Sequence, residues 1–206
     1  GTVAGAAAAA VATGIVDPDA VTYRHGRIEA VADDVTGEKH LAGLASIGIV
    51  DRPFVGTRAV VDPTELLGGV VSRAHPSDLG LGSVAGCFGV IEPDAPGGAV
   101  FSRMIDWDAR DPGATPRSAT ALIAPGMVTT VGVERHDTLD WGEPATFEVS
   151  DCVIGADGER EVELVDATVE LTPTADGPRL VDVDATLDAA VASGTLVQDG
   201  TARANR

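Results

Sequence analysis

The sequence has little basic charge. It holds 14 lysine and arginine residues against 32 aspartates and glutamates, and Lys39 is the only lysine. The formal net charge of −18 argues against nucleic acid as a partner, because clustered lysines and arginines bind phosphate groups. So much acid repels itself in dilute buffer, but in molar salt the Debye length falls to about 3 Å. The composition therefore predicts a protein adapted to a high-salt environment.

Aromatic residues are also scarce, at 3% of the chain. The core must therefore be built from Val, Ile, Leu and Ala, which bury less area per residue than aromatic rings. Salt strengthens apolar burial and offsets this deficit. We therefore expect a fold that loosens when salt is removed.

Long apolar runs are missing. None reaches the ~18 residues that span a bilayer, so the sequence predicts no membrane span. The opening segment GTVAGAAAAAVATGIV has no basic flank, so it predicts neither a signal peptide nor an anchor. Because the chain does not start with Met, we expect that an upstream piece has been removed or left out.

Cysteine is rare, with Cys87 and Cys152 as the two examples. They allow one disulfide, although buried free thiols are the commoner arrangement in apolar stretches. The motifs CxxC, HxxxH, HExxH, GxGxxG and GxxxxGK[ST] are all absent. The sequence therefore predicts neither a zinc site nor a standard phosphate-binding loop.

The chain does show apolar and polar residues that alternate with a period of two, interrupted by glycine and proline. This pattern is typical of antiparallel sheets. We expect all-β structure, an antiparallel sandwich or barrel with long loops and an Ala/Gly-rich N-terminal arm. His25-Gly26 is expected to form a tight hairpin and Ala156-Asp157-Gly158 a turn. The predicted strands are residues 21–24, 27–31, 46–50, 54–61, 66–72, 84–91, 99–105, 128–134, 145–154, 161–171 and 180–187.

The positions of the proline and glycine residues also predict the domain organisation. An N-terminal arm (1–19) precedes a β-rich domain (20–107), and a Pro/Gly-rich connection (108–126) follows it. A second β-rich domain, or the second half of the same sandwich, covers 127–187, and a C-terminal tail covers 188–206.

Two groups of residues are candidate sites. His75 precedes Cys87 by one short segment, and a histidine with a thiol nucleophile is the minimal catalytic pair of a hydrolase. Gly86 and Gly89 around that cysteine fit close backbone packing equally well. Asp106, Asp108 and Asp111 supply hard oxygen ligands of the kind that Ca²⁺ takes. In so acidic a chain, a solvated loop explains these three aspartates as well, and no other cofactor is indicated.

The opening GTVAGAAAAAVATG and the turn-rich segment VTYRHGRIEAVADDVTGEKHLAG resemble head-decoration, capsid and tail proteins of tailed viruses of halophilic archaea. This resemblance implies a structural virion component that contacts copies of itself or other structural subunits. It also implies a virion or extracellular location. It assigns no functional residue.

Two alternatives remain open at this point. One is a halophilic β-rich enzyme, a hydrolase or isomerase that uses His75 with Cys87 or with an acid. The other is a secreted surface-layer domain that binds calcium at Asp106, Asp108 and Asp111.

Overall fold

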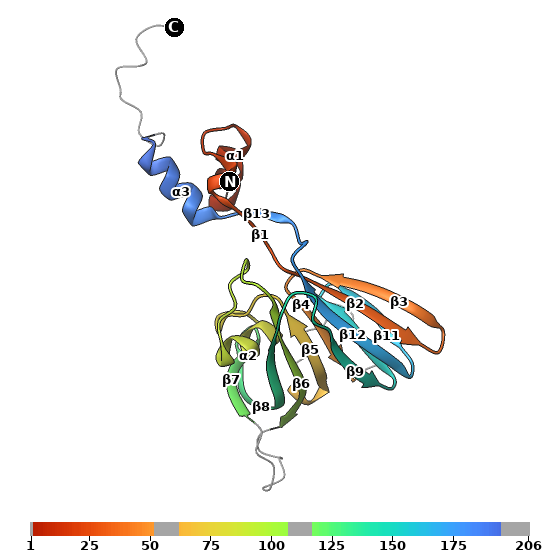
Figure 1. The fold of residues 1–206 in the computed structure, drawn as a ribbon. Helices are drawn as coiled ribbons and strands as arrows, with labels where there is room; N and C mark the ends of the chain where they lie inside the picture. Colours follow the sequence, from red (N-terminus) through yellow and green to blue (C-terminus); the bar gives the residue numbers. More distant parts are fainter. Residues whose placement is uncertain (1, 52–61, 107–116, 195–206) are drawn as a thin grey trace, which may run out of the picture. The chain divides into compact units, whose positions relative to one another are not determined.

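The computed structural model describes residues 2–51, 62–106 and 117–194 (Figure 1). The chain forms two compact units. One unit combines the segments Gly1–Arg24 and Pro178–Arg206, and the other is the continuous segment His25–Gly177.

The His25–Gly177 unit is a sandwich of two antiparallel sheets. The larger sheet has seven strands in the order β11-β10-β4-β5-β6-β8-β7, and the smaller has four in the order β3-β2-β12-β9. The all-β sandwich predicted from the period of two is therefore confirmed. The strands are β2 (Arg27–Asp34), β3 (Gly37–Gly43), β4 (Ser46–Val50), β5 (Leu66–Val71), β6 (Gly98–Asp106), β7 (Arg117–Ala124), β8 (Met127–Leu139), β9 (Ala145–Val149), β10 (Cys152–Ala156), β11 (Arg160–Leu164) and β12 (Ala167–Thr174).

The larger sheet separates two hydrophobic cores. Val70 and Val100 lie in the core between the sheets, whereas their chain neighbours Val71 and Phe101 lie in a second core on the opposite face. Because successive side chains of a strand point to opposite faces, continuous apolar runs such as LLGGVV fill both cores. Phe101 is fully buried.

Glycines in β4 and β5 make room for larger side chains. Gly48 and Gly69 are paired across the two strands, and a Cβ atom on either would crowd Leu81. Leu81 packs against the second core. On the other face, the ring of Phe147 occupies the space that a side chain at Gly68 would need.

The predicted turn at Ala156-Asp157-Gly158 is present and joins β10 to β11. Asp157 and Gly158 have φ angles of 53° and 72°, and the N–H of Glu159 donates to the carbonyl of Ala156 at 3.0 Å. Two consecutive positive φ angles define a type I′ turn, which matches the twist of paired strands.

Helix α2 (Leu81–Phe88) replaces the strand predicted for 84–91. The prediction was wrong because Val84, Ala85 and Phe88 follow Leu81 at helical spacing and pack on the second core together. Helix α2 lies against β7, the outermost strand of the larger sheet (Figure 1).

The predicted hairpin at His25-Gly26 was also wrong. Strand β1 (Thr22–Arg24) pairs with β13 (Arg179–Val181), whereas β2 pairs with β3 and β12. The N–H of Gly26 donates to the carbonyl of Pro93 at 2.9 Å. A Cβ atom at Gly26 would lie 2.7 Å from the ring of Trp141. Glycine therefore allows the backbone to pack closely against Trp141, and it does not form a tight turn.

Several predicted boundaries also need correction. The connection predicted for 108–126 includes strand β7, because Pro125-Gly126 is the turn of a β7–β8 hairpin. The segments predicted for 145–154 and 161–171 are each two strands, interrupted at Ser150-Asp151 and Val165-Asp166. The strand predicted for 54–61 lies outside the described residues.

The other unit consists mainly of helices α1 (Val3–Ala12) and α3 (Val183–Ala192). The Ala/Gly-rich N-terminal arm is therefore helical in its first part. The hydroxyl of Thr2 caps α1 at the N–H of Gly5, and the carboxylate of Asp182 caps α3 at the N–H of Ala185. Neither helix, nor any other in the described part of the chain, is long and apolar enough to cross a membrane.

Candidate functional site

The loop between β5 and α2 presents the predicted residue His75. Its ring Nδ1 accepts the backbone N–H of Ser77 at 3.1 Å and lies 2.6 Å from the hydroxyl of Ser77. Because a backbone N–H can only donate, this Nδ1 carries no proton. In the matching neutral tautomer the other ring nitrogen, Nε2, holds the N–H, and because His75 is exposed this N–H can donate to an acceptor on a ligand.

Two pairs of hydrogen bonds fix the conformation of the loop. The carboxylate of Asp78 accepts the N–H of His75 at 3.0 Å and the guanidinium of Arg73 at 3.3 Å. Paired backbone hydrogen bonds of 2.9 and 3.0 Å join Ala74 to Ile91. The position of the His75 ring is thus set before any ligand arrives.

Helix α2 is wedged between this loop and β7. A Cβ atom at Gly86 would overlap the backbone of His75, so the helix packs directly on the loop. The buried hydroxyl of Ser83 donates to the carbonyl of Pro76 at 3.1 Å and accepts the N–H of Leu122 at 2.9 Å. One side chain therefore links the loop, the helix and the sheet.

The C-terminal end of α2 carries the second predicted residue, Cys87. Its Sγ atom lies 3.5 Å from the carbonyl oxygen of Thr120. In the described residues no recorded contact joins Cys87 to His75, whose ring is bonded to Ser77. Neither the structure nor the comparisons below test a catalytic role for this pair, which stays a prediction.

Next to Cys87, three side chains from separate segments stack together. The guanidinium carbon of Arg117 lies 4.5 Å from the centroid of the Phe88 ring, and the ring of His136 lies 4.7 Å from the same centroid. Burial, followed by the positive charge of Arg117, lowers the pKa of His136 from its ordinary value of 6.5. The imidazole of His136 is thus held in its neutral form near neutral pH.

The two cysteines are not bonded to each other. Cys87 is exposed and Cys152 is buried. Burial, with smaller contributions from Asp51 and Asp151, raises the pKa of the Cys152 thiol to about 11. Cys152 is therefore an inert core residue, and Cys87 is the accessible thiol.

The structure gives no test of the predicted calcium site. Asp108 and Asp111 lie outside the described residues, and Asp106 ends strand β6. Across residues 2–51, 62–106 and 117–194, no three His, Cys, Asp or Glu side chains are grouped to hold a metal ion. Ca²⁺ at Asp106, Asp108 and Asp111 stays a prediction.

Sequence reasoning missed the Phe88, Arg117 and His136 cluster. Phe88 and Arg117 are 29 positions apart, and Arg117 and His136 are 19 apart. Only the pairing of β7 with β8 and the packing of α2 bring them together. Nothing in the local sequence marks them.

Comparisons with known proteins show which family the sandwich belongs to. The family model described as the acetoin catabolism protein X C-terminal domain matches residues 27–176, nearly the whole of the His25–Gly177 unit. The chain belongs to this family. Acetoin catabolism protein X from Cupriavidus necator is 29% identical over 162 residues, which cover 78% of this chain and 44% of that relative. The chain thus spans less than half the length of this acetoin catabolism protein.

Membership in the acetoin catabolism protein X family corrects the functional predictions. The resemblance to virion structural proteins was wrong, since it rested on general composition and a short stretch, whereas the family match covers the sandwich. The predicted virion or extracellular location was wrong for the same reason, because it rested on the virion resemblance and the family is one of acetoin catabolism proteins. The family supports neither the hydrolase or isomerase alternative nor the surface-layer alternative.

Proposed function

We propose that this chain takes part in acetoin catabolism, as the β-sandwich domain of a protein related to acetoin catabolism protein X. One observation carries the proposal. The family match and the compact His25–Gly177 unit have nearly the same boundaries, so the similarity covers an entire folding unit. A match to a whole domain supports a shared role better than a match to scattered strands would.

Within this domain, we place small-molecule recognition at His75. Acetoin and its breakdown products are small polar molecules with carbonyl or hydroxyl oxygens. The exposed Nε2–H of His75 is a fixed donor for such an oxygen, because Ser77 holds Nδ1 as an acceptor and Asp78 holds the backbone.

Growth of the host tests the proposal. Deleting the gene is expected to slow growth on acetoin as the carbon source while leaving growth on other carbon sources unchanged. The intact gene should restore growth, whereas a gene lacking the codons for residues 27–176 should not. Equal growth of the deletion strain and its parent on acetoin would contradict a role in this pathway.

A single substitution tests the placement at His75 separately. His75→Ala removes the donor, whereas Ser77→Ala keeps the ring and removes one contact to it. We expect His75→Ala to complement the deletion poorly and Ser77→Ala to complement it more fully. Full complementation by His75→Ala would show that His75 does not recognise the small molecule. The proposed role in acetoin catabolism would be unaffected.

A further inference from the structure

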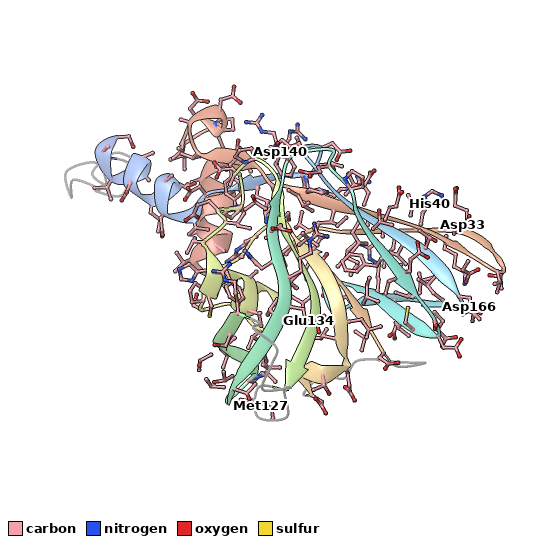
Figure 2. All side chains as sticks on the ribbon, turned by 60° about the horizontal axis from the view of Figure 1, so that its bottom comes forward. Asp33, His40, Met127, Glu134, Asp140 and Asp166 are labelled. Atoms are coloured by element: carbon pink, nitrogen blue, oxygen red, sulfur yellow. The ribbon has the colours of Figure 1, made fainter. Side chains whose placement is uncertain are left out.

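The carboxylate of Asp78 is largely enclosed, with 23% of its side chain exposed. Other acids of the sandwich reach into solvent, and Figure 2 labels four exposed examples: Asp33, Glu134, Asp140 and Asp166. Exposed carboxylates are ordinary in so acidic a chain, because water hydrates them at the surface. An enclosed carboxylate in the same loop as His75 requires a local explanation.

Asp78 lies against the first turn of helix α2. A Cβ atom at Gly82 would lie 3.2 Å from the Oδ2 atom of Asp78, so this glycine lets the carboxylate approach the helix closely. The side chain of the N-cap residue, Gly80, makes no capping hydrogen bond. The first N–H groups of a helix have no partner within it, so its N-terminus is partly positive and attracts anions. Asp78 supplies that negative charge from within the chain.

The cation of the loop is also directed at Asp78. Arg73 is the only arginine or lysine in residues 72–80, and its guanidinium donates to the Oδ1 atom of Asp78 at 3.3 Å. The Oδ2 atom accepts the backbone N–H of His75 at 3.0 Å. One carboxylate therefore neutralises both positive features beside His75, the guanidinium of Arg73 and the N-terminus of α2.

This arrangement treats charged and uncharged ligands of His75 differently. An anionic ligand would meet no unused positive charge from the loop or from the start of α2. It would also bring a second negative charge next to the carboxylate of Asp78, and like charges close together raise the free energy of both. An uncharged ligand avoids this cost, because one donor, the Nε2–H of His75, is enough to orient its carbonyl or hydroxyl oxygen.

We propose that Asp78 determines the specificity of the His75 site, which admits uncharged ligands with a carbonyl or hydroxyl oxygen and excludes carboxylates and phosphates. The proposal rests on the proposed recognition of a small molecule at His75. Within that role it names the substrate class, because acetoin is an uncharged hydroxyketone whereas acetate and phosphate are anions. A fixed like charge that repels the wrong ligand is an established source of specificity.

NMR signals of the His75 ring test this selectivity at constant pH and ionic strength. In the wild-type chain acetoin should shift these signals with saturation, whereas acetate and inorganic phosphate should not. Asp78→Asn keeps the shape of the side chain and removes its charge, which makes Arg73 and the start of α2 available to an anion. The dissociation constants for acetate and phosphate should fall at least about tenfold, while that for acetoin changes by less than about twofold.

Two variants are matched controls. Asp137→Asn removes the same charge and also frees an arginine, because Asp137 pairs with Arg135 on the surface of strand β8. Asp78→Glu keeps the charge and lengthens the side chain. Neither variant should make the His75 signals respond to acetate or phosphate, and thermal melts confirm that each variant is folded. A gain of anion binding in Asp78→Glu equal to that in Asp78→Asn would overturn the proposal, because it would come from a disturbed loop and not from charge.

Two other results would also overturn the proposal: a wild-type chain in which acetate or phosphate shifts the His75 signals as strongly as acetoin does, or an Asp78→Asn variant that gains no anion binding. Failure of the proposed recognition at His75 looks different. In that case acetoin would shift the His75 signals in neither protein, while Asp78→Asn would still gain acetate or phosphate. That result would overturn recognition of acetoin at His75 and uphold the exclusion of anions by Asp78.

Discussion

The ammonium group of Lys39 lies 2.6 Å from the Oδ2 atom of Asp34, whose side chain is completely buried. Lys39 also donates to the carbonyl of Glu163 at 2.8 Å, and the other oxygen of Asp34 accepts the N–H and hydroxyl of Thr36. The only lysine of the chain thus joins the β2–β3 turn to strand β11. A buried charge that loses its partner is strongly destabilising, so this pair is a sensitive point of the fold.

Replacing Lys39 by methionine should lower the free energy of unfolding, because the Asp34 carboxylate would stay buried without its cation. The matched control is Arg135→Met, since Arg135 pairs with Asp137 at 2.6 Å on the surface, with both side chains more than half exposed. Removing that exposed pair should cost at most about 1 kcal/mol. Guanidinium unfolding midpoints compare the two variants. If Lys39→Met lowers the free energy of unfolding no more than Arg135→Met does, the buried Lys39–Asp34 pair is not a sensitive point of the fold.

The same pair predicts a dependence on acid. The hydrogen bond from Lys39, followed by that from Thr36, holds the pKa of Asp34 far below its ordinary value of 3.8. A carboxyl whose pKa is lowered by folding stabilises the protein above the unfolded pKa, and this contribution is lost as the pH falls through the folded pKa. The stability advantage of the wild type over Asp34→Asn should therefore shrink below about pH 4. An advantage that stays constant down to pH 2 would contradict this.

The pKa of His136 should lie below that of an ordinary histidine, and the positive charge of Arg117 should be one cause. Burial comes first and the charge of Arg117 second among the causes that lower its pKa. A lowered histidine pKa means that the folded state favours the neutral ring, so this contribution to stability is lost as the pH falls from about 7 through the folded pKa. Arg117→Met should raise the pKa of His136 in an NMR titration, whereas Arg73→Met should not, because Arg73 pairs with Asp78 and is not among the charges that act on His136. No change on removing Arg117 would exclude its charge as a cause.

Gly69→Ala should destabilise the sandwich by about 1–3 kcal/mol, the usual cost of overfilling a packed core. The added Cβ atom would lie 2.6 Å from the carbonyl oxygen of Ile47, a backbone atom with little freedom to move. Gly155→Ala is the control, because its nearest neighbour would be 3.9 Å away. Thermal melts of both variants decide the matter, and equal melting temperatures would show that β4 and β5 separate easily.

The two thiols should differ in reactivity. In the folded protein a thiol reagent should modify Cys87, which is exposed, and should leave Cys152, whose pKa burial raises to about 11. Mass spectrometry should therefore count one label in native buffer and two in denaturant. Cys87→Ser should reduce these numbers to none and one. Rapid native labelling of Cys152 would mean that the core between the sheets opens readily.

The sandwich was predictable because the period of two survives in most strands. Short Val- and Gly-rich runs bounded by proline and glycine predicted β5 and β6, and turn chemistry predicted the Asp157-Gly158 turn, from local residues alone. Helix α2 was not predicted, because four glycines in residues 80–89 looked like a packed strand and concealed the spacing of Leu81, Val84 and Phe88. The pairing of β1 with β13 depends on residues more than 150 positions apart, and no local pattern reports so distant a contact.

The candidate site was predictable only in part. His75 stood out because histidines are few, but the Ser77 and Asp78 contacts that fix it depend on the loop conformation. The stacking of Phe88, Arg117 and His136 requires the assembled sheet. Lys39 was conspicuous as the only lysine, whereas the burial of its partner Asp34 became visible only with the turn in place.

Strands β1 and β13 place Arg24 directly opposite Arg179, and within the sandwich Gly177 lies against the backbone of His25. The domain therefore begins and ends at neighbouring points, as an insertion does in a host protein. Such a module can be exchanged between proteins, or excised and closed with a two-residue loop, at small cost in chain entropy.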